Sequence, residues 1–171
     1  MGETGEARER AFDELFRAAW PRAVMAARRI LGPDADTEAL AAEALTRAYD
    51  RWPRLCRHPA PEAWVLRVTI NLAIDVARRA RRSAAAAAPQ GFGGAAAPRL
   101  ALAAALQALP EKQRQAIALR YLADCEEATI AGALGIRPGT VKTHLKRGLS
   151  HLRDQLGPDT EKHHDLIPEL G

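Results

Sequence analysis

The segment Glu126–Leu152 (EEATIAGALGIRPGTVKTHLKRGLSHL) constrains the fold more than any other part of the chain. Ile130 and Leu134 lie four residues apart, so a helix would place both on one face. Gly135 can adopt the left-handed conformation that ends a helix, and Pro138 fits the first turn of a new one, where its missing N–H is not needed. The pattern therefore predicts two short helices joined by a tight turn.

The second of these helices has an apolar face and a basic face. Its inward residues recur at helical spacing: Val141, Leu145, Leu149 and Leu152. Its outward residues are hydrogen-bond donors and cations: Arg137, Thr140, Lys142, Thr143, His144, Lys146 and Arg147. No acidic residue follows Arg137 until Asp154. We therefore favour a helix-turn-helix that places its second helix in the major groove of DNA over a merely solvated basic surface.

Composition and charge agree with a small helical protein that binds a polyanion. Hydrophobic residues make up 47% of the 171 residues, but aromatic residues only 5%, which favours small helical cores over a large sheet. The net charge of +4 fits a nucleic-acid partner without requiring one. The two cysteines, Cys56 and Cys125, have no zinc-ligand spacing, so we expect no metal and no cofactor. No segment has the length and apolarity of a membrane span or the form of a secretory signal, so we expect a cytoplasmic protein.

A first helical block is predicted over residues 11–82. Gly32-Pro33 ends its first apolar run, and an irregular loop with three prolines is expected over Pro53–Pro61. A long helix should follow over Glu62–Arg82. Its predicted buried stripe consists of Val65, Val68, Leu72 and Val76.

A second, polar line runs along the same long helix. It comprises Arg67, Asn71, Arg78 and Arg82, with Asp75 and Arg79 adjacent. The run of arginines at its end suits phosphate contact, but cations also stabilise a helix C-terminus, so both interpretations stay open. Asn71 and Asp75 could likewise satisfy polar groups between packed helices, and we expect Trp64 to be a core residue rather than a platform for a base.

The segment Ser83–Pro98 (SAAAAAPQGFGGAAAP) is uncharged and consists mostly of Ala, Gly and Pro. It cannot bury enough surface to order itself, so it is expected to be a flexible linker that spans at most roughly 53 Å. A second helical block is predicted over residues 99–156. Residues 157–171 are expected to form a mobile tail, whose adjacent His163 and His164 lack further ligands for a metal site.

Three segments together resemble the extracytoplasmic-function (ECF) group of the sigma-70 family of bacterial RNA polymerase sigma factors. Ala108–Arg153 resembles the sigma-4 domain of this family nearly throughout. Ala63–Arg79 (AWVLRVTINLAIDVARR) is similar to the end of the sigma-2 domain, and Asp34–Trp52 to the helix that binds the polymerase. The resemblance implies an all-α fold of two small helical domains, sigma-2 and sigma-4 like, joined by a flexible linker.

The resemblance also implies a function and its residues. The basic helix would read the −35 promoter element through the seven outward residues named above, while the first block would recognise and melt the −10 element. The −10 candidates are Arg54, Arg57, Arg67, Asn71, Arg78 and Arg79. The polymerase-binding candidates are Leu40, Glu43 and Arg47. Implied partners are double-stranded promoter DNA, the melted −10 strand and bacterial core RNA polymerase; an anti-sigma factor is a possible partner that the sequence does not show.

Three positions depart from the family pattern. Ala39 and Ala42 stand where polar polymerase contacts are usual, Ile70 stands where an arginine is common, and Arg137 replaces the usual serine N-cap of the basic helix. Because each lost charged hydrogen bond can cost roughly 1.5–3 kcal/mol, the alanines keep an alternative function open: a stand-alone DNA-binding regulator with weakened or lost polymerase binding. Carboxylate clusters and nucleophile motifs are absent, so the chain is not expected to be an enzyme.

Overall fold

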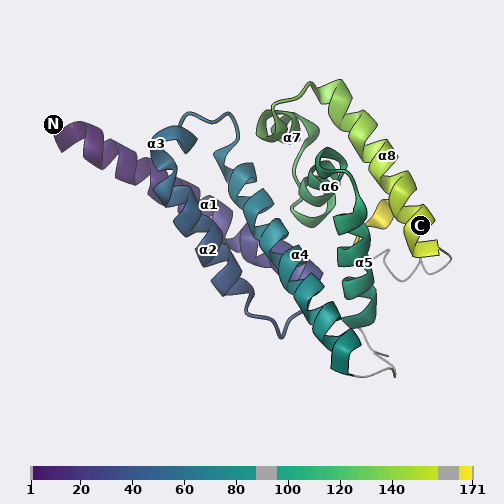
Figure 1. The fold of residues 1–171 in the computed structure, drawn as a ribbon. Helices are drawn as coiled ribbons and strands as arrows, with labels where there is room; N and C mark the ends of the chain where they lie inside the picture. Colours follow the sequence, from purple (N-terminus) through teal and green to yellow (C-terminus); the bar gives the residue numbers. More distant parts are fainter. Residues whose placement is uncertain (1, 88–95, 158–165, 171) are drawn as a thin grey trace.

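The described part of the chain is built from helices alone. The computed structural model describes residues 2–87, 96–157 and 166–170, and within these ranges it contains no strand. The all-α prediction is thereby confirmed. We call residues 2–87 the first half and residues 96–157 the second half (Figure 1).

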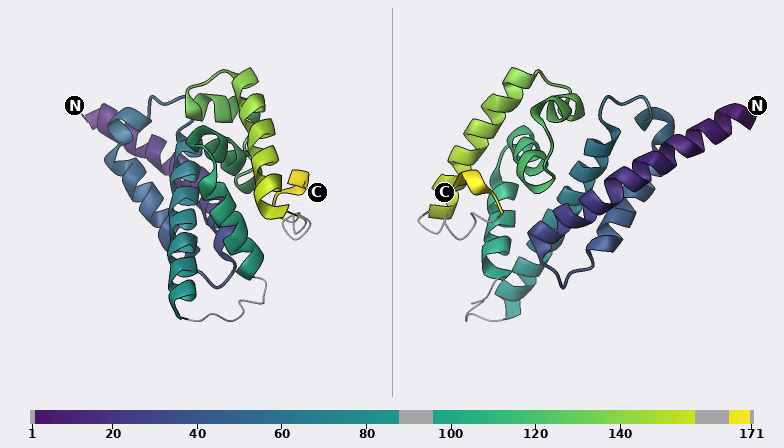
Figure 2. Two further views of the ribbon diagram at one scale, coloured as in Figure 1. Left: turned by 45° about the vertical axis from the view of Figure 1, so that its right-hand side comes forward. Right: turned by 180° about the vertical axis from the view of Figure 1, so that it is seen from behind.

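The first half contains α1 (Gly2–Leu31), α2 (Thr37–Asp50), the single turn α3 (Trp52–Leu55) and α4 (Pro61–Ala87). The carboxylate of Asp36 caps α2 by accepting a hydrogen bond from the backbone N–H of Ala39 at 3.0 Å. The helices α1 and α2 pack on α4, and the N-terminal turns of α1 project beyond them (Figures 1 and 2).

Helix α1 passes through Pro21, with Ala19 and Ala23 fully buried on either side of the proline. Two predicted boundaries in this half differ from the structure. The loop expected over Pro53–Pro61 begins with α3, and α4 continues beyond Arg82 to Ala87. The alanines after Arg82 are strong helix formers, so the helix extends into them.

Helix α4 is buried on more than the one stripe that its sequence predicts. Val65 is fully buried in a cluster with α1, α2 and α3, but Val76 is 37% exposed, so the predicted stripe is wrong at its end. A second stripe lies in the main core: Leu66, Ile70, Ala73, Ile74 and Ala77. Because α4 lies between other helices, its apolar residues face in two directions, and Ile70 is buried in a place where an arginine would lack solvent.

The second half contains α5 (Ala96–Ala108), α6 (Glu111–Ile117), the π-helical turn η1 (Ala118–Leu122), α7 (Glu127–Leu134) and α8 (Pro138–Leu156). Pro110 separates α5 from α6, as its sequence position predicts. The middle of the predicted linker, residues 88–95, lies outside the described residues, whereas its two ends belong to α4 and α5.

The C-terminal segment is partly ordered against the second half. Ile167 is fully buried in the main core, and the 3-10 turn η3 (Pro168–Leu170) follows it beside α8. The expectation of a mobile tail is therefore wrong for residues 166–170, because Ile167 and the neighbouring Leu166 pack against the core and Arg153 donates to the Glu169 carbonyl. His163 and His164 lie outside the described residues.

The two halves pack against each other. One continuous core contains Ile30 of α1 and Ile74 of α4 together with Leu102 and Leu106 of α5. In Figures 1 and 2, α5 runs beside α4, while α8 lies on the side of the second half away from α1. A sequence with a linker between two blocks does not by itself predict this contact.

Candidate nucleic-acid interface

The helix-turn-helix forms as its sequence predicts. Gly135 has a φ of +63°, and its N–H caps α7 by donating to the carbonyls of Ala131 and Gly132. Pro138 occupies the first turn of α8, where no donor is needed. Lys112 of α6 donates from Nζ to the Leu134 carbonyl at 3.1 Å and so satisfies another group at the end of α7. The corner between the two helices is thus fixed by backbone geometry.

The inner face of α8 is held firmly by α6. Val141 and Leu152 are fully buried and Leu145 nearly so, while Leu149 is half-buried against the same core, which confirms the predicted stripe. At Gly148 the two helices approach so closely that a Cβ would lie 2.8 Å from Cγ1 of Ile117. The orientation of the outer face is therefore rigidly determined.

The outer face of α8 presents most of the predicted donors to solvent. The exposed residues are Arg137, Thr140, Lys142, Thr143, Lys146 and Arg147, whereas His144 is half-buried. The Lys142 ammonium lies 3.9 Å from the Glu127 carboxylate, but the Lys142 side chain remains 72% exposed. This exposed ion pair is therefore weak. Thr143 donates to the Gly139 carbonyl of its own helix. The resulting surface is cationic and rich in donors, as contacts to phosphates and base edges require.

Arg137 occupies the N-cap position of α8 without capping it. Its backbone is extended, and its side chain makes no hydrogen bond to the first turn. The predicted loss of a capping hydrogen bond is thus confirmed. The exposed guanidinium is left at the N-terminal end of the basic helix.

The first-half candidates do not form one open surface. Arg54, Arg57 and Arg79 are exposed, and Arg78 pairs with Asp75 of the same helix at 3.1 Å. By contrast, Arg67 and Asn71 are half-buried on a face of α4. Burial lowers the pKa of Arg67, while the charge of Glu111, at the start of α6 in the second half, raises it.

Trp64 is half-buried on α4, one helical turn before Arg67. The indole packs against the cluster around Leu15 and Val65, and the Arg51 guanidinium lies over its ring at 5.9 Å from the centroid. A ring covered in this way is a packing element with a cation–π contact rather than an open platform for a base.

The predicted polymerase-binding residues lie on α2 as expected from their spacing. Glu43 and Arg47 are exposed and pair with each other at 2.8 Å, while Leu40 is half-buried against the core. Ala39 and Ala42 are exposed beside them. The exposed surface of α2 therefore combines small side chains with an ion pair whose charges satisfy each other.

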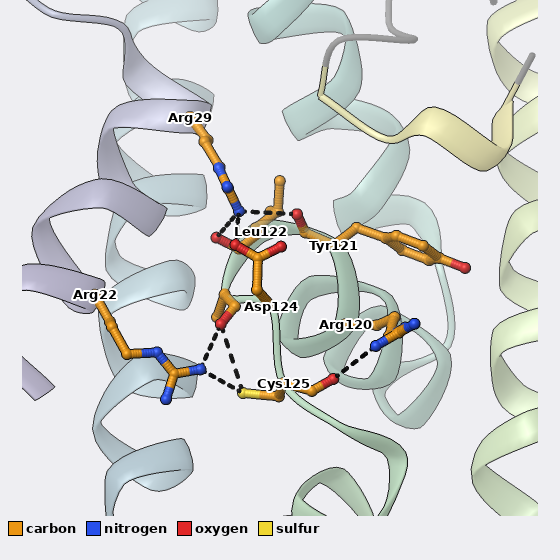
Figure 3. Close-up of polar contacts among 8 residues, drawn as sticks. Arg22, Arg29, Arg120, Tyr121, Leu122, Asp124 and Cys125 are labelled. Atoms are coloured by element: carbon orange, nitrogen blue, oxygen red, sulfur yellow. Dashed lines mark hydrogen bonds and ion pairs between the residues drawn. The ribbon is translucent and has the colours of Figure 1, made fainter. Parts of the chain in front are cut away.

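Two arginines at the contact between the halves were not predicted from the sequence. Arg22 and Arg29 project from α1 onto the end of η1 and the residues that follow it, where they bind backbone carbonyls and Asp124 (Figure 3). Their seven-residue separation places them on one side of α1. The sequence offers no signal for their partners, which are mainly backbone atoms some 90–100 positions away.

Two other classes of site find no support within the described ranges. No group of three or more His, Cys, Asp or Glu residues there could hold a metal ion. Among the helices that the structure describes, none has the length and apolarity needed to cross a membrane.

Comparison with known protein families matches both halves. The model of sigma-70 region 2 matches residues 15–83, and that of sigma-70 region 4 matches residues 99–152. An all-helical chain that carries region 2, then region 4 with an exposed basic helix-turn-helix, is a transcription initiation factor. The chain belongs to the sigma-70 family of RNA polymerase sigma factors, in its ECF group. It is a DNA-binding initiation factor and not an enzyme.

Curated relatives agree over most of the chain. The chain is 32% identical over 162 residues to an RNA polymerase sigma-E factor of Streptomyces coelicolor, covering 91% of this chain and 89% of the relative. It is 31% identical over 148 residues to the ECF RNA polymerase sigma factor SigW of Bacillus subtilis, covering 75% of this chain and 79% of the relative.

Solved structures show the same fold. The sigma factor RpoE in complex with the anti-sigma factor NepR from Bartonella quintana matches with a TM-score of 0.51 and 20% identity, over 86% of this chain and 98% of that one. CnrH in complex with the cytosolic domain of CnrY matches with a TM-score of 0.51 and 23% identity, over 86% and 88%.

Proposed function

We propose that this sigma factor reads the −35 element with the outer face of α8. The observation that carries the proposal is the exposure of Lys146, Arg147 and their neighbours on a helix whose opposite face is locked against α6. A rigid helix with free cations can enter a major groove without reorganisation of its own domain. Arg137, at the N-terminal end of this helix, lies where such helices commonly approach base edges.

We further propose that the first half serves the −10 element and the polymerase. Arg54, Arg57 and Arg79 supply exposed cations for the melted strand, and Arg67 and Asn71 join them when they are accessible. Core RNA polymerase binds the exposed side of α2 around Glu43 and Arg47. We propose a division into a first domain (11–82), a linker (83–98) and a second domain (99–156), which the matches over residues 15–83 and 99–152 support. The protein acts in the cytoplasm, where polymerase and chromosomal DNA are found.

Two solved structures of similar fold are complexes, one of a sigma factor with the anti-sigma factor NepR and one of CnrH with the cytosolic domain of CnrY. We infer that an anti-sigma factor also binds here. The alternative of a stand-alone regulator rests on Ala39 and Ala42, which offer polymerase no polar side chain on α2. The neighbouring Glu43 and Arg47 are paired with each other. Native pull-down with core polymerase distinguishes the two, because the stand-alone regulator would bind promoter DNA but not the core enzyme.

The DNA contact is tested by Lys146→Ala/Arg147→Ala. We expect at least tenfold weaker binding to a −35 duplex, a shallower salt dependence and loss of run-off transcription, because two phosphate or base contacts are removed. The matched control is Arg17→Ala/Arg28→Ala, which removes the same charge from exposed positions of α1. Equal effects of the two double variants would show that net charge, and not α8, determines binding.

A further inference from the structure

The backbone carbonyls at the end of the π-helical turn η1 receive side-chain donors, and within the second half the Ala123 carbonyl accepts a long hydrogen bond from Sγ of Cys125 at 3.8 Å. After Leu122 the chain turns sharply, and Asp124 has a φ of +50°, so no further helical turn is present to supply N–H donors to the last carbonyls. Such carbonyls carry the negative end of the helix dipole and favour a cation.

The cations come from the other half of the molecule. Arg29 donates from Nη1 to the carbonyls of Tyr121 at 3.2 Å and Leu122 at 3.0 Å, and Arg22 donates from Nη2 to that of Ala123 at 2.7 Å (Figure 3). We call this set of contacts the arginine cap. It is a helix C-cap supplied by α1 across the contact between the halves.

Carboxylates hold both arginines in place. Arg29 pairs with Asp124 at 2.7 Å, and Arg22 pairs with Glu62 at the start of α4. The same Arg22 nitrogen lies 3.6 Å from Sγ of Cys125, which is only 2% exposed. The cap therefore joins α1 and α4 to the second half and covers a thiol.

A second contact between the halves depends on a glycine, which has no side chain. A Cβ on Gly132 of α7 would lie 3.6 Å from Pro59 and 3.7 Å from Ala60, both in the segment before α4. A methyl group would just fit, whereas a longer side chain would meet both residues. This contact offers a way to separate the halves without touching the arginines.

We call the arrangement in which the two halves pack against each other the closed state. It affects the two proposed DNA-reading surfaces differently. On α4, Arg67, Ile74 and Ala77 share a face at helical spacing; Ile74 and Ala77 lie in the core that contains α5, and Arg67 interacts with Glu111 of α6. The −10 candidate Arg67 is thus half-buried against the second half and Asn71, one helical turn further on, is also half-buried, whereas the outer face of α8 is open.

In the closed state the protein is also too small to reach the −35 and −10 elements of a promoter at the same time. Elements about 24 base pairs apart are separated by roughly 80 Å at 3.4 Å per pair. A compact chain of this length has a radius of gyration of about 15 Å. Both elements can be bound together only after the halves separate.

We propose that the arginine cap is an autoinhibitory contact, and that this sigma factor engages the −10 element only after Arg22 and Arg29 leave the carbonyls at the C-terminal end of η1. The proposal rests on the proposed division of −35 and −10 reading between the halves. In the closed state the protein binds −35 DNA alone; separation of the halves exposes Arg67 and Asn71 and completes promoter binding.

The two cysteines provide a direct measurement of opening. Cys56 is exposed and Cys125 is buried, so in a Cys56→Ser background the rate of reaction with a thiol reagent reports the exposure of Cys125. Arg22→Ala/Arg29→Ala should raise this rate by about tenfold or more, because charge-assisted hydrogen bonds to three carbonyls are lost. Gly132→Leu should raise it as well, through a different contact. Arg17→Ala/Arg28→Ala is the charge-matched control and should leave the rate unchanged.

The same proteins are then tested on two DNA probes, a −35 duplex and a single-stranded −10 oligonucleotide. We expect both opening variants to bind the −10 strand about tenfold more tightly, with −35 binding unchanged. Circular dichroism verifies that helix content is retained; Gly132→Leu remains the test if the double arginine variant does not fold.

Three results would be decisive. Unchanged labelling in both opening variants would overturn the closed state. Faster labelling without tighter −10 binding would overturn its inhibitory role. Loss of −35 binding in Lys146→Ala/Arg147→Ala, measured separately, tests the proposed function itself, so the two failures are distinguishable.

Discussion

The outer face of α8 and the face of α4 that carries Arg67 have similar sequences but different surroundings. Both helices bear basic residues at helical spacing beside an apolar stripe. On α8 the cations are exposed, with Lys142 retaining 72% of its side-chain surface, whereas Arg67 is half-buried near Glu111. Periodicity shows which side chains share a face, but a tertiary contact decides whether that face meets solvent.

The difference also separates the two proposed DNA-binding surfaces. The outer face of α8 is exposed and rigidly held, because the inner face of the helix is fixed by contacts within its own half. The α4 surface depends on where the other half lies. Under the proposed assignment, the sigma factor binds a −35 element in its closed state and requires a rearrangement before it engages the −10 element.

The largest effect is expected at the locked inner face of α8. Gly148→Leu would force a side chain into the position 2.8 Å from Ile117, so we expect a loss of about 2–3 kcal/mol in the free energy of unfolding. Denaturant unfolding followed by circular dichroism measures it.

The matched control uses another glycine of the same helix. A Cβ on Gly139 meets no atom within 4 Å, so Gly139→Ala should be neutral or slightly stabilising through helix propensity. If both substitutions have the same effect, the inner face of α8 is not tightly packed, and the rigidity on which the comparison depends is absent.

The next prediction contrasts the two faces directly in DNA binding. Arg147→Ala should weaken binding to a −35 duplex by up to about tenfold and reduce the salt slope by about 1, because one phosphate contact is lost. Arg67→Ala should leave both the affinity and the slope for this probe unchanged. A reduced slope for Arg67→Ala would place that residue at the −35 contact and remove the distinction between the surfaces.

A smaller effect is expected at Asp124, which pairs with Arg29. Asp124→Asn keeps a side chain that tolerates a positive φ but removes the charge. Because the Asp124 side chain is 70% exposed, the ion pair should contribute only about 0.5–1 kcal/mol, and Cys125 labelling should accelerate two- to fivefold at low salt. In 1 M salt the difference should largely vanish; its persistence would show that charge is not the cause.

Much of the second half could be predicted from local sequence. Gly135 and Pro138 specify the turn by their own backbone preferences, and the stripe from Val141 to Leu152 follows from spacing alone. These features need no knowledge of distant residues. For the same reason the exposed face of α8 was predicted correctly, except that His144 is half-buried.

The features that sequence could not predict all depend on distant partners. Val76 belongs to the same predicted helical stripe as Val65. It is nevertheless 37% exposed, because the neighbouring helices cover other parts of α4. Arg22 and Arg29 bind backbone carbonyls, which every residue carries, so no side-chain pattern marks their targets. The large apolar residues of the tail are Leu166, Ile167 and Leu170, too few for a periodic pattern, although Ile167 is fully buried.

The smallest effect is expected from pH, and it concerns the thiol beneath the arginine cap. Burial raises the pKa of Cys125 above its ordinary value of 9.0, and this outweighs the opposing charge of Arg22. A raised thiol pKa means that the closed state binds the proton more tightly than an open or unfolded state does. Its contribution to stability is therefore fully present below pH 9 and is lost as the pH rises through the folded-state value.

Cys125→Ala removes this titration while leaving the arginines in place. The free energy of unfolding of the wild type should fall more steeply than that of the variant between pH 8 and 10, as measured by denaturant unfolding at each pH. Tyr121, whose pKa burial also raises, titrates in both proteins and cancels in the comparison. Parallel pH profiles would show that Cys125 is as accessible to solvent in the folded protein as in the unfolded chain, and that Arg22 does not cover it.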